Sequence, residues 1–223
     1  MNLSKGIEEV ILLVEKFCKM LTQKIRNKMP EIDDERAEVI NYGLQLVLGE
    51  IPKTIIILLT AWLLRILKLT VLAFLIIIPY RTFSGGVHLK THIGCIIATT
   101  ISYIGNAFLS SKIVLASNIK FILIIAIWIF SIFMIKLYAP ADTEAVPILR
   151  KKERRIKKLL SYITMTLNLL IAFFIKNQVI SNLLIFGTLI QTITITRFIY
   201  KLTNNKYGYE EYMKNENIQT SIL

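Results

Sequence analysis

Six stretches without a charged residue follow one another through most of this sequence, and they restrict its fold more than any other feature. They cover residues 54–64, 69–80, 93–111, 121–135, 159–175 and 177–196. A bilayer-spanning helix needs about 20 mostly apolar residues, so the last four stretches are long enough or nearly so. Arg65 and Lys68 interrupt the first two, which we interpret as a helical hairpin. The sequence therefore predicts an all-α, polytopic transmembrane helical bundle, with six spans favoured.

The composition supports a membrane protein over a soluble or disordered one. Hydrophobic residues make up 54% of the 223 residues, and the mean hydropathy of +0.58 exceeds that of usual soluble domains. A net charge of +12 would suggest nucleic acid as the partner of a soluble protein. In membrane proteins, however, Lys and Arg collect in cytoplasmic loops and face anionic lipids. We therefore expect anionic membrane lipids as partners and no nucleic acid.

The positions of Lys and Arg test the six-span topology. With a cytoplasmic N-terminus, 22 of the 27 Lys and Arg residues fall on the cytoplasmic side. The remaining five are Arg65, Lys68, Lys112, Lys120 and Lys176. This asymmetry is what the positive-inside rule expects, so both the N- and C-termini are predicted to be cytoplasmic.

The N-terminal region predicts helices outside the membrane core. Between residues 5 and 28, apolar residues recur at spacings of three and four, which is typical of an N-terminal amphipathic helix. Its apolar partner is either the inner membrane surface or the protein's own loops, because the periodicity is the same in both cases. Pro30 ends this helix, and Asp33 or Asp34 caps a second one that leads towards Pro52.

These features divide the chain into three regions. Residues 1–50 form the interfacial helices, residues 51–200 the transmembrane bundle, and residues 201–223 a cytoplasmic tail. Two segments of the bundle stand out, one at 79–95 and a basic loop at 138–158. Both fall on the cytoplasmic side of the predicted topology. We therefore expect a multi-pass protein of the cell membrane with its chemistry at the cytoplasmic face.

Segment 79–95 gathers reactive side chains. It contains both histidines of the chain, His88 and His92, and one of its two cysteines, Cys95. If a helix starts near Val87, these three residues lie at positions i, i+4 and i+7, on one helical face. The pattern then brings a thiol and two imidazoles together at the edge of a span.

These residue types suit a cysteine nucleophile. The reactive form is the thiolate, and a free thiol with a pKa of about 8.5 is only a few per cent ionised at pH 7. A neighbouring imidazole raises that fraction by taking the proton, and it then returns the proton to the leaving amine. Gly85 and Gly86 permit a sharp turn just before the histidines. Arg81 and the N–H groups of a helix start would favour the anion further.

Two other chemistries match the segment less well. Two His and one Cys could bind zinc, but the sequence has no acidic residue between Glu50 and Asp142 to act as general base or fourth ligand. The second cysteine, Cys18, is far away in the sequence. A serine hydrolase of the Gly-x-Ser-x-Gly type is disfavoured because that motif is missing from the sequence. We therefore expect no metal and no other cofactor.

A small multi-pass transporter or peptide exporter without peptidase activity is the alternative function. It predicts intramembrane charge pairs, inverted repeats or broken helices in matching halves of the chain. The predicted spans carry few charges, and the reactive groups gather at one membrane edge. The two functions differ in their need for Cys95, because a transporter would tolerate its loss.

The run from Tyr80 to His88, with Cys95 seven residues further on, resembles the accessory gene regulator B (AgrB) family of membrane peptidases from Gram-positive quorum-sensing systems. A second stretch, from Tyr138 to Thr143, is followed by Pro147 and seven basic residues and is similar to the family's central cytoplasmic loop. The stretch Tyr42-Gly43-Leu44 also fits, so the resemblance covers nearly the whole chain.

The resemblance implies a cysteine endopeptidase that removes the C-terminal tail of a short amphipathic propeptide, the precursor of a cyclic autoinducing peptide. Carried over by position, Cys95 is the nucleophile and His88 is the general base and acid. Spacing alone leaves His92 as another partner for Cys95. The resemblance also implies that a Cys or Ser of the substrate captures the acyl-thioester on Cys95, which gives a thiolactone or lactone.

Substrate contacts follow from the charge map and the glycine turn. Family propeptides end in an acidic tail, which the basic residues after position 149 would attract, although topology and lipid headgroups explain these residues as well. Backbone N–H groups of the turn or the helix start would stabilise the oxyanion. We therefore assign substrate binding to Arg81, Gly85, Gly86, Arg150, Lys151 and Lys152. Association of the small bundle into a homodimer stays open.

Overall fold

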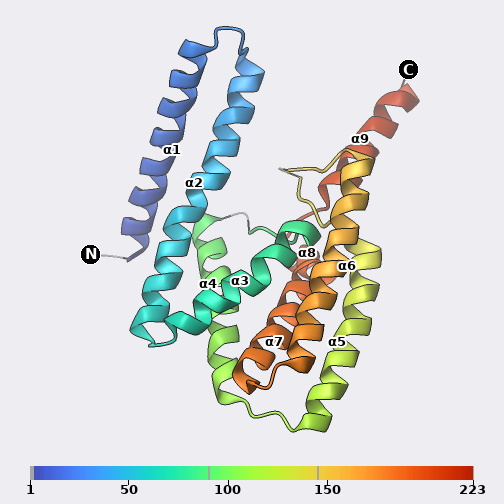
Figure 1. Cartoon of the computed structure of the whole chain (residues 1–223). Helices are drawn as coiled ribbons and strands as arrows, with labels where there is room; N and C mark the ends of the chain where they lie inside the picture. The colour runs from blue at the N-terminus through green and yellow to red at the C-terminus, as the bar shows by residue number, and fades with distance from the viewer. Residues whose placement is uncertain (1–2, 90, 145, 223) are drawn as a thin grey trace. The chain divides into compact units, whose positions relative to one another are not determined.

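The computed structural model describes residues 3–89, 91–144 and 146–222, and within these residues it contains nine helices and no strand. The helices are α1 (Leu3–Lys28), α2 (Asp34–Leu63), α3 (Leu67–Ser84), α4 (His92–Lys112), α5 (Ser117–Tyr138), α6 (Lys151–Phe174), α7 (Gln178–Thr194), α8 (Arg197–Leu202) and α9 (Gly208–Ile222) (Figure 1). The predicted all-α class is confirmed. The chain forms two compact units, Met1–Leu64 and Arg65–Leu223, which we describe separately.

The first unit is a pair of helices. The predicted amphipathic helix is α1, and it packs against α2 and buries Cys18 and Thr22. Asp33 caps α2, as predicted, because its carboxylate accepts the N–H of Arg36 at 2.8 Å. The second interfacial helix and the first apolar stretch form one continuous helix of 30 residues that runs through Pro52. Apolar residues after the proline favour continued helix, since backbone groups in lipid must be paired within the chain.

The second unit begins at Arg65, where the helical conformation is interrupted between α2 and α3. Arg65 has a positive φ of 59° and separates α2 from α3, so the two apolar stretches predicted as a hairpin do belong to two helices. Within the described residues, five helices, α2 to α6, are long and apolar enough to cross a membrane. Helix α7 is apolar but has only 17 residues. A multi-pass membrane protein is therefore supported, while the sixth span stays a prediction.

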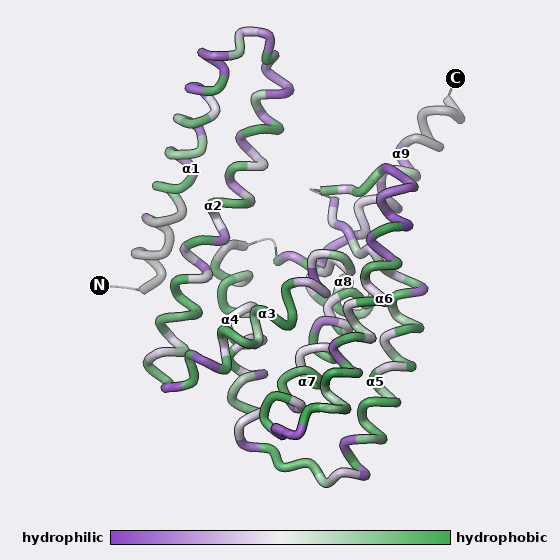
Figure 2. Tube along the Cα trace, viewed as in Figure 1, coloured by the Kyte–Doolittle hydropathy of each residue, from purple (hydrophilic) through white to green (hydrophobic). Residues whose placement is uncertain are grey.

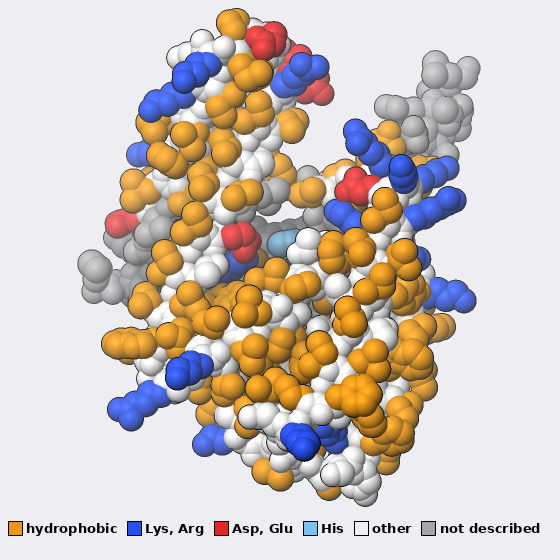
Figure 3. Space-filling model, in the orientation of Figure 1, with side chains coloured by type: hydrophobic (Ala, Val, Ile, Leu, Met, Phe, Trp, Pro, Cys, Tyr) orange, Lys and Arg blue, Asp and Glu red, His pale blue; other side chains and the backbone are white. Residues whose placement is uncertain are grey.

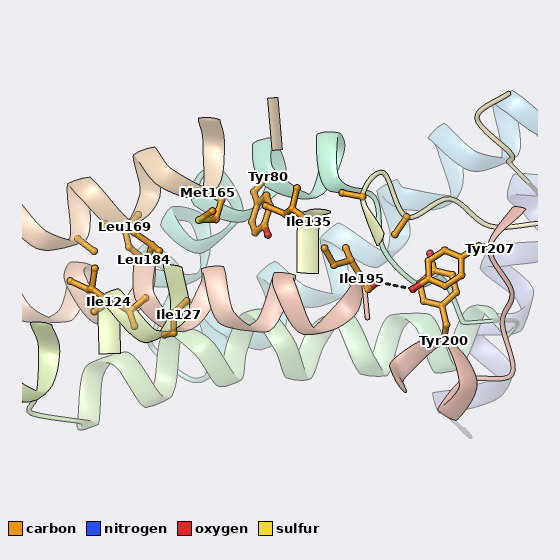
Figure 4. Close-up of a cluster of buried hydrophobic side chains, with 14 residues drawn as sticks. Tyr80, Ile124, Ile127, Ile135, Met165, Leu169, Leu184, Ile195, Tyr200 and Tyr207 are labelled. Atoms are coloured by element: carbon orange, nitrogen blue, oxygen red, sulfur yellow. Dashed lines mark hydrogen bonds between the residues drawn. The ribbon is translucent and has the colours of Figure 1, made fainter. Parts of the chain in front are cut away.

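Helix α7 is the centre of the second unit. It packs against α3, α4, α5 and α6, and Leu183, Leu184 and Ile185 of its first turns are fully or almost fully buried. Figure 4 shows the surrounding apolar cluster, to which α3 contributes Tyr80 and α6 contributes Met165.

Large hydrophobic side chains cover the outer faces of the second unit. On α5 and α6 they include Phe121, Trp128, Phe133, Leu167 and Phe174, all at least 40% exposed. Apolar residues predominate along the trace of α5 in Figure 2, and many apolar side chains lie on the face that Figure 3 shows. An exposed apolar surface of this extent is typical of contact with lipid.

Hydrogen bonds between polar side chains tie the buried helices together. The hydroxyl of Thr192 in α7 lies 3.0 Å from that of Tyr80 in α3 and 2.8 Å from that of Ser131 in α5. Asn106 of α4 donates to the Leu183 carbonyl of α7 at 3.1 Å. Such bonds hold membrane helices in register, because inside a bilayer the hydrophobic effect does not favour contact with another helix over contact with lipid.

The connections place three segments distant in sequence at one end of the second unit. The C-termini of α3, α5 and α7 and the N-termini of α4 and α6 all lie there (Figure 1). Fourteen of the nineteen Lys and Arg residues of this unit belong to this end by their place in the sequence, and the other five are those predicted to lie outside. The end therefore contains both the predicted catalytic segment and the predicted basic loop.

Candidate active site

The turn that follows α3 requires both of its glycines. Gly85 caps α3 with a φ of 72°, and its N–H donates to the Arg81 carbonyl at 2.9 Å. A Cβ atom at Gly85 would collide with the carbonyl of Ala141. Gly86 has a φ of 143°, and a Cβ atom there would lie 2.8 Å from the hydroxyl of Thr194. The predicted sharp turn is confirmed, and close neighbours as well as backbone conformation exclude side chains from it.

The loop after α5 holds this turn from one side. The N–H of Gly86 donates to the Ala141 carbonyl at 2.9 Å, and the N–H of Ala141 donates to the Ser84 carbonyl at 2.8 Å. The two backbones thus pair in parallel over one bridge. The two stretches that stood out separately in the sequence, 80–88 and 138–143, are therefore parts of a single structure.

The C-terminal end of α7 holds the turn from the other side. The amide of Gln191 donates to the Ser84 hydroxyl at 2.9 Å and to the Gly85 carbonyl at 2.8 Å. The N–H of Val87 donates to the Thr194 carbonyl at 3.1 Å. Sequence reasoning missed this contribution of α7, since the only signal was a polar residue, Gln191, inside an apolar stretch.

Arg81 lies inside this arrangement, half-buried. Its guanidinium donates to the Val87 carbonyl at 3.0 Å and to the Gln191 side-chain oxygen at 3.4 Å. Arg81 thus braces the turn from within α3. Its role in substrate binding, like that of Gly85 and Gly86, stays a prediction.

His88 and Cys95 flank the start of α4. That helix begins at His92 rather than near Val87, so the prediction of one helical face that includes His88 is wrong. The reason is local, because Thr91 is a good N-cap and its hydroxyl accepts the N–H of Gly94 at 3.2 Å. His88 is exposed in the loop before the helix, and the half-buried Cys95 lies in the first turn of the helix.

Two threonines near the start of α4 contact Cys95. The N–H of Cys95 donates to the Thr91 carbonyl at 3.0 Å, and its sulfur lies 4.0 Å from the hydroxyl of Thr99. The backbone of His92 belongs to the first turn of α4, but its side chain lies outside the described part of the structure. The choice between His88 and His92 as the partner of Cys95 therefore stays as the resemblance made it.

A buried carboxylate organises the loop after α5. Oδ2 of Asp142 accepts the Arg154 guanidinium at 2.9 Å, the Ile148 N–H at 2.8 Å and the Tyr209 N–H at 3.2 Å. Arg154 also donates to the Pro140 carbonyl at 3.3 Å. One of the seven basic residues of the loop is therefore engaged in holding the loop itself.

Two of the other six basic residues of the loop also bind groups of the protein itself. Lys157 pairs with Glu153 at 3.1 Å, and Lys158 donates to a backbone carbonyl of α5 at 2.8 Å. Arg150, Lys151 and Lys152 are exposed at the N-terminus of α6, and none of the three forms an ion pair within the described residues. These three, which the sequence assigned to substrate binding, remain accessible, and so does Arg155 on the next turn.

A groove lies beside these basic residues, between the C-terminus of α3 and the N-terminus of α6. It has a volume of about 400 Å³. Its lining is Thr82, Phe83, Arg150, Lys152, Glu153, Ile156, Lys157 and Leu160. The groove therefore combines an apolar floor with a mostly basic rim, and it adjoins the helix that leads into the glycine turn.

The chain after α7 packs onto the same loop. The hydroxyl of Tyr200 donates to the Asp142 carbonyl at 3.1 Å, and that of Tyr207 donates to the Ile195 carbonyl at 2.8 Å (Figure 4). The two rings stack with centroids 4.1 Å apart. Burial raises the pKa of both phenols above the usual value, and the nearby Asp142 raises that of Tyr200 further.

Comparisons with known proteins agree over most of the chain. The sequence profile described as accessory gene regulator B matches residues 18–195. An AgrB-like protein from Listeria monocytogenes serotype 4a is 28% identical over 202 residues, which cover 90% of this chain and 95% of the relative. Similar proteins from Listeria innocua and Clostridium acetobutylicum are 29% and 24% identical, over 90% of this chain and 95% and 94% of theirs. No solved structure matches the chain.

Proposed function

The chain belongs to the accessory gene regulator B family of the agr quorum-sensing system, and from this membership we propose that it is a cysteine endopeptidase that processes a short quorum-sensing propeptide. The observation that carries the proposal is that the turn after α3, His88 and the start of α4 follow one another at one end of the second unit. A braced turn leads directly into His88, and the next helix presents Cys95 in its first turns. Because Val87 is fixed at both its N–H and its carbonyl, the backbone immediately before His88 is restricted.

The proposed reaction uses the thiol and one imidazole. His88 takes the proton of Cys95, and the thiolate sulfur attacks the scissile carbonyl carbon. The C–N bond breaks as His88 returns the proton to the leaving amine, and the acyl group stays on Cys95 as a thioester. A thiol or hydroxyl of the bound peptide then displaces Cys95, which closes the ring and regenerates the thiol. The thioester stores the energy for ring closure, so the reaction requires no ATP.

Hydrogen bonds of the turn bear on which N–H groups could stabilise the oxyanion. The N–H groups of Gly85, Gly86 and Val87 already donate to carbonyls of the protein. We therefore assign the oxyanion to the first N–H groups of α4, at His92 and Ile93, because a helix leaves its first N–H groups without intrahelical partners. The N-terminus of α4 also favours a negative charge near the thiol.

The groove between α3 and α6 is our proposed site for the acidic tail of the propeptide. Arg150 and Lys152 on its rim offer positive charge, while Phe83, Ile156 and Leu160 on its floor suit apolar side chains. Two residues that line the groove, Thr82 and Phe83, come directly before the turn that leads to His88. We propose that these parts face the cytoplasm, as the distribution of Lys and Arg favours.

The proposal is tested by cleavage in lipid vesicles. The purified chain would be reconstituted with the short, acidic-tailed propeptide encoded next to it, and the products followed by mass spectrometry. We expect Cys95→Ala and His88→Ala to abolish cleavage, and a covalent peptide adduct to form only when Cys95 is present. Cys18→Ala is the matched control, since this second thiol is buried in α1, and it should cleave normally. Full activity of Cys95→Ala would refute the peptidase.

A further inference from the structure

Gln191 occupies an unusual position for an amide in a membrane protein. Its side chain is 2% exposed near the end of α7, more than 100 residues from the turn that it contacts. Both ends of the amide are used, because its nitrogen donates to Ser84 and Gly85 and its oxygen accepts from Arg81. Burial of an amide is unfavourable unless its donors and its acceptor are hydrogen-bonded. The three bonds therefore fix the side chain of Gln191 against the turn.

The contacts of Gln191 converge on the residue before His88. Arg81, which Gln191 holds through its side-chain oxygen, donates to the carbonyl of Val87 at 3.0 Å. The N–H of the same Val87 donates to the Thr194 carbonyl, one turn further along α7. Both backbone groups of Val87 thus depend on α7, one directly and one through Arg81 and Gln191.

We infer that Gln191 is a positioning residue for His88. It touches neither the thiol nor the imidazole in the described contacts, and it acts through Arg81 and Gly85. This inference rests on the proposed peptidase activity, and it adds a residue outside segment 79–95 on which that activity depends. An amide suits the position because it donates to a carbonyl and accepts from a guanidinium at once, which neither a carboxylate nor an apolar side chain does.

The test replaces Gln191 in two ways and compares each variant with a neighbour. Gln191→Met keeps the length and removes every hydrogen bond, whereas Gln191→Glu keeps the acceptor for Arg81 and loses the donors to Ser84 and Gly85. Thr192→Val is the matched control, since Thr192 is equally buried on the same helix but bonds to Tyr80 and Ser131 instead. All chains carry Cys18→Ala, so that Cys95 is the single thiol.

Two measurements separate positioning from a general loss of stability. In vesicles, we expect Gln191→Met to lower kcat about 10²-fold with little change in KM, as displacement of a catalytic group by about 1 Å does. Gln191→Glu should lie between Gln191→Met and the parent, and Thr192→Val should cleave within a factor of about two of the parent.

The second measurement is the rate at which iodoacetamide alkylates Cys95 as a function of pH. If Gln191 places His88 beside the thiol, Gln191→Met should slow alkylation near neutral pH as much as His88→Ala does. The rates should converge well above the usual thiol pKa of about 8.5, where the thiol ionises without help. A purely structural role would alter the rate equally at every pH.

Each outcome bears on one hypothesis. Parental kcat and a parental alkylation profile in Gln191→Met would overturn the inference while Cys95→Ala still abolished cleavage. Cleavage that survives Cys95→Ala would instead overturn the peptidase itself, whatever the Gln191 variants do. If Gln191→Met does not accumulate in the membrane, Gln191→Glu decides, and a parental pH profile in that variant would equally refute the positioning role.

Discussion

The carboxylate of Asp142 and the guanidinium of Arg154 form an ion pair of 2.9 Å in which the Asp142 side chain is fully buried. This pair joins the loop after α5 to the N-terminus of α6, and the adjacent Ala141 backbone pairs with the glycine turn. The loop that supports the candidate active site is thus held in place by Arg154, one of the seven basic residues that follow position 149.

Breaking this pair should destabilise the protein. Asp142→Ala removes an acceptor from three donors and leaves Arg154 without its counter-charge, which for buried pairs costs about 3–5 kcal/mol. Since Arg154 is partly exposed, we expect the lower end of that range. Unfolding followed by helical circular dichroism in detergent micelles measures the effect. Arg155→Gln is the control on the same turn, because Arg155 is exposed and should alter stability by less than about 0.5 kcal/mol.

A methyl group at Gly85 should strongly reduce cleavage. Gly85→Ala places a Cβ against the Ala141 carbonyl at a positive φ, so the turn or the loop must move. We expect cleavage to fall at least about 10²-fold, by displacement of His88. Gly105→Ala in α4 is the matched control, because a Cβ there meets nothing within 4 Å and alanine favours a helix. Equal activities of the two variants would contradict the role of the turn.

Exposed charges at the start of α6 should affect substrate affinity rather than chemistry. Arg150→Glu and Lys152→Glu should each raise KM several-fold at low salt and leave kcat nearly unchanged, since an exposed pair contributes about 0.2–1 kcal/mol. The effect should shrink as salt screens the charges. Initial rates at several propeptide and salt concentrations measure it. Lys112→Glu, at the opposite end of α4, should behave as the parent, and an equal rise in its KM would argue for a nonspecific charge effect.

The stacked phenols should make stability sensitive to alkaline pH. Burial raises the pKa of Tyr200 and Tyr207 in the folded protein, whereas an unfolded tyrosine titrates near its ordinary pKa of about 10. The stabilisation is therefore fully present below pH of about 10 and is lost as pH rises above it towards the folded pKa values. Unfolding temperatures measured from neutral to strongly alkaline pH should fall less steeply in Tyr207→Phe than in the parent. Identical slopes would contradict the prediction.

Sequence patterns predicted local features well. Charge-free stretches indicated the helices of the second unit, Asp33 was recognised as a cap, and Gly85 and Gly86 marked a turn that the structure confirms. Each of these features depends on a few neighbouring residues whose types favour one local structure. The predicted start of α4, near Val87, lies five residues before the observed start at His92, because the N-cap at Thr91 and not the glycine turn decides where the helix begins.

Relationships between distant segments were beyond such patterns. Nothing in the sequence near Gln191 indicates that it contacts Ser84, because the pairing depends on how α3 and α7 pack. Likewise, Arg154 is one of seven similar basic residues in the sequence. Only its ion pair with the buried Asp142, which depends on the fold, gives it a different role from Arg150. Periodicity also left α7 equivalent to the other spans, although burial on several sides gives it a different role.

The dependence of the turn on α7 also sets the time at which the site can be completed during synthesis. His88 and Cys95 leave the ribosome about 100 residues before Gln191 and Thr194, whose contacts complete the brace. A nascent or truncated chain would therefore contain the whole reactive segment without the support of its second side. Under the proposed function, the thiol would reach full activity only after α7 has been made and has packed against α3.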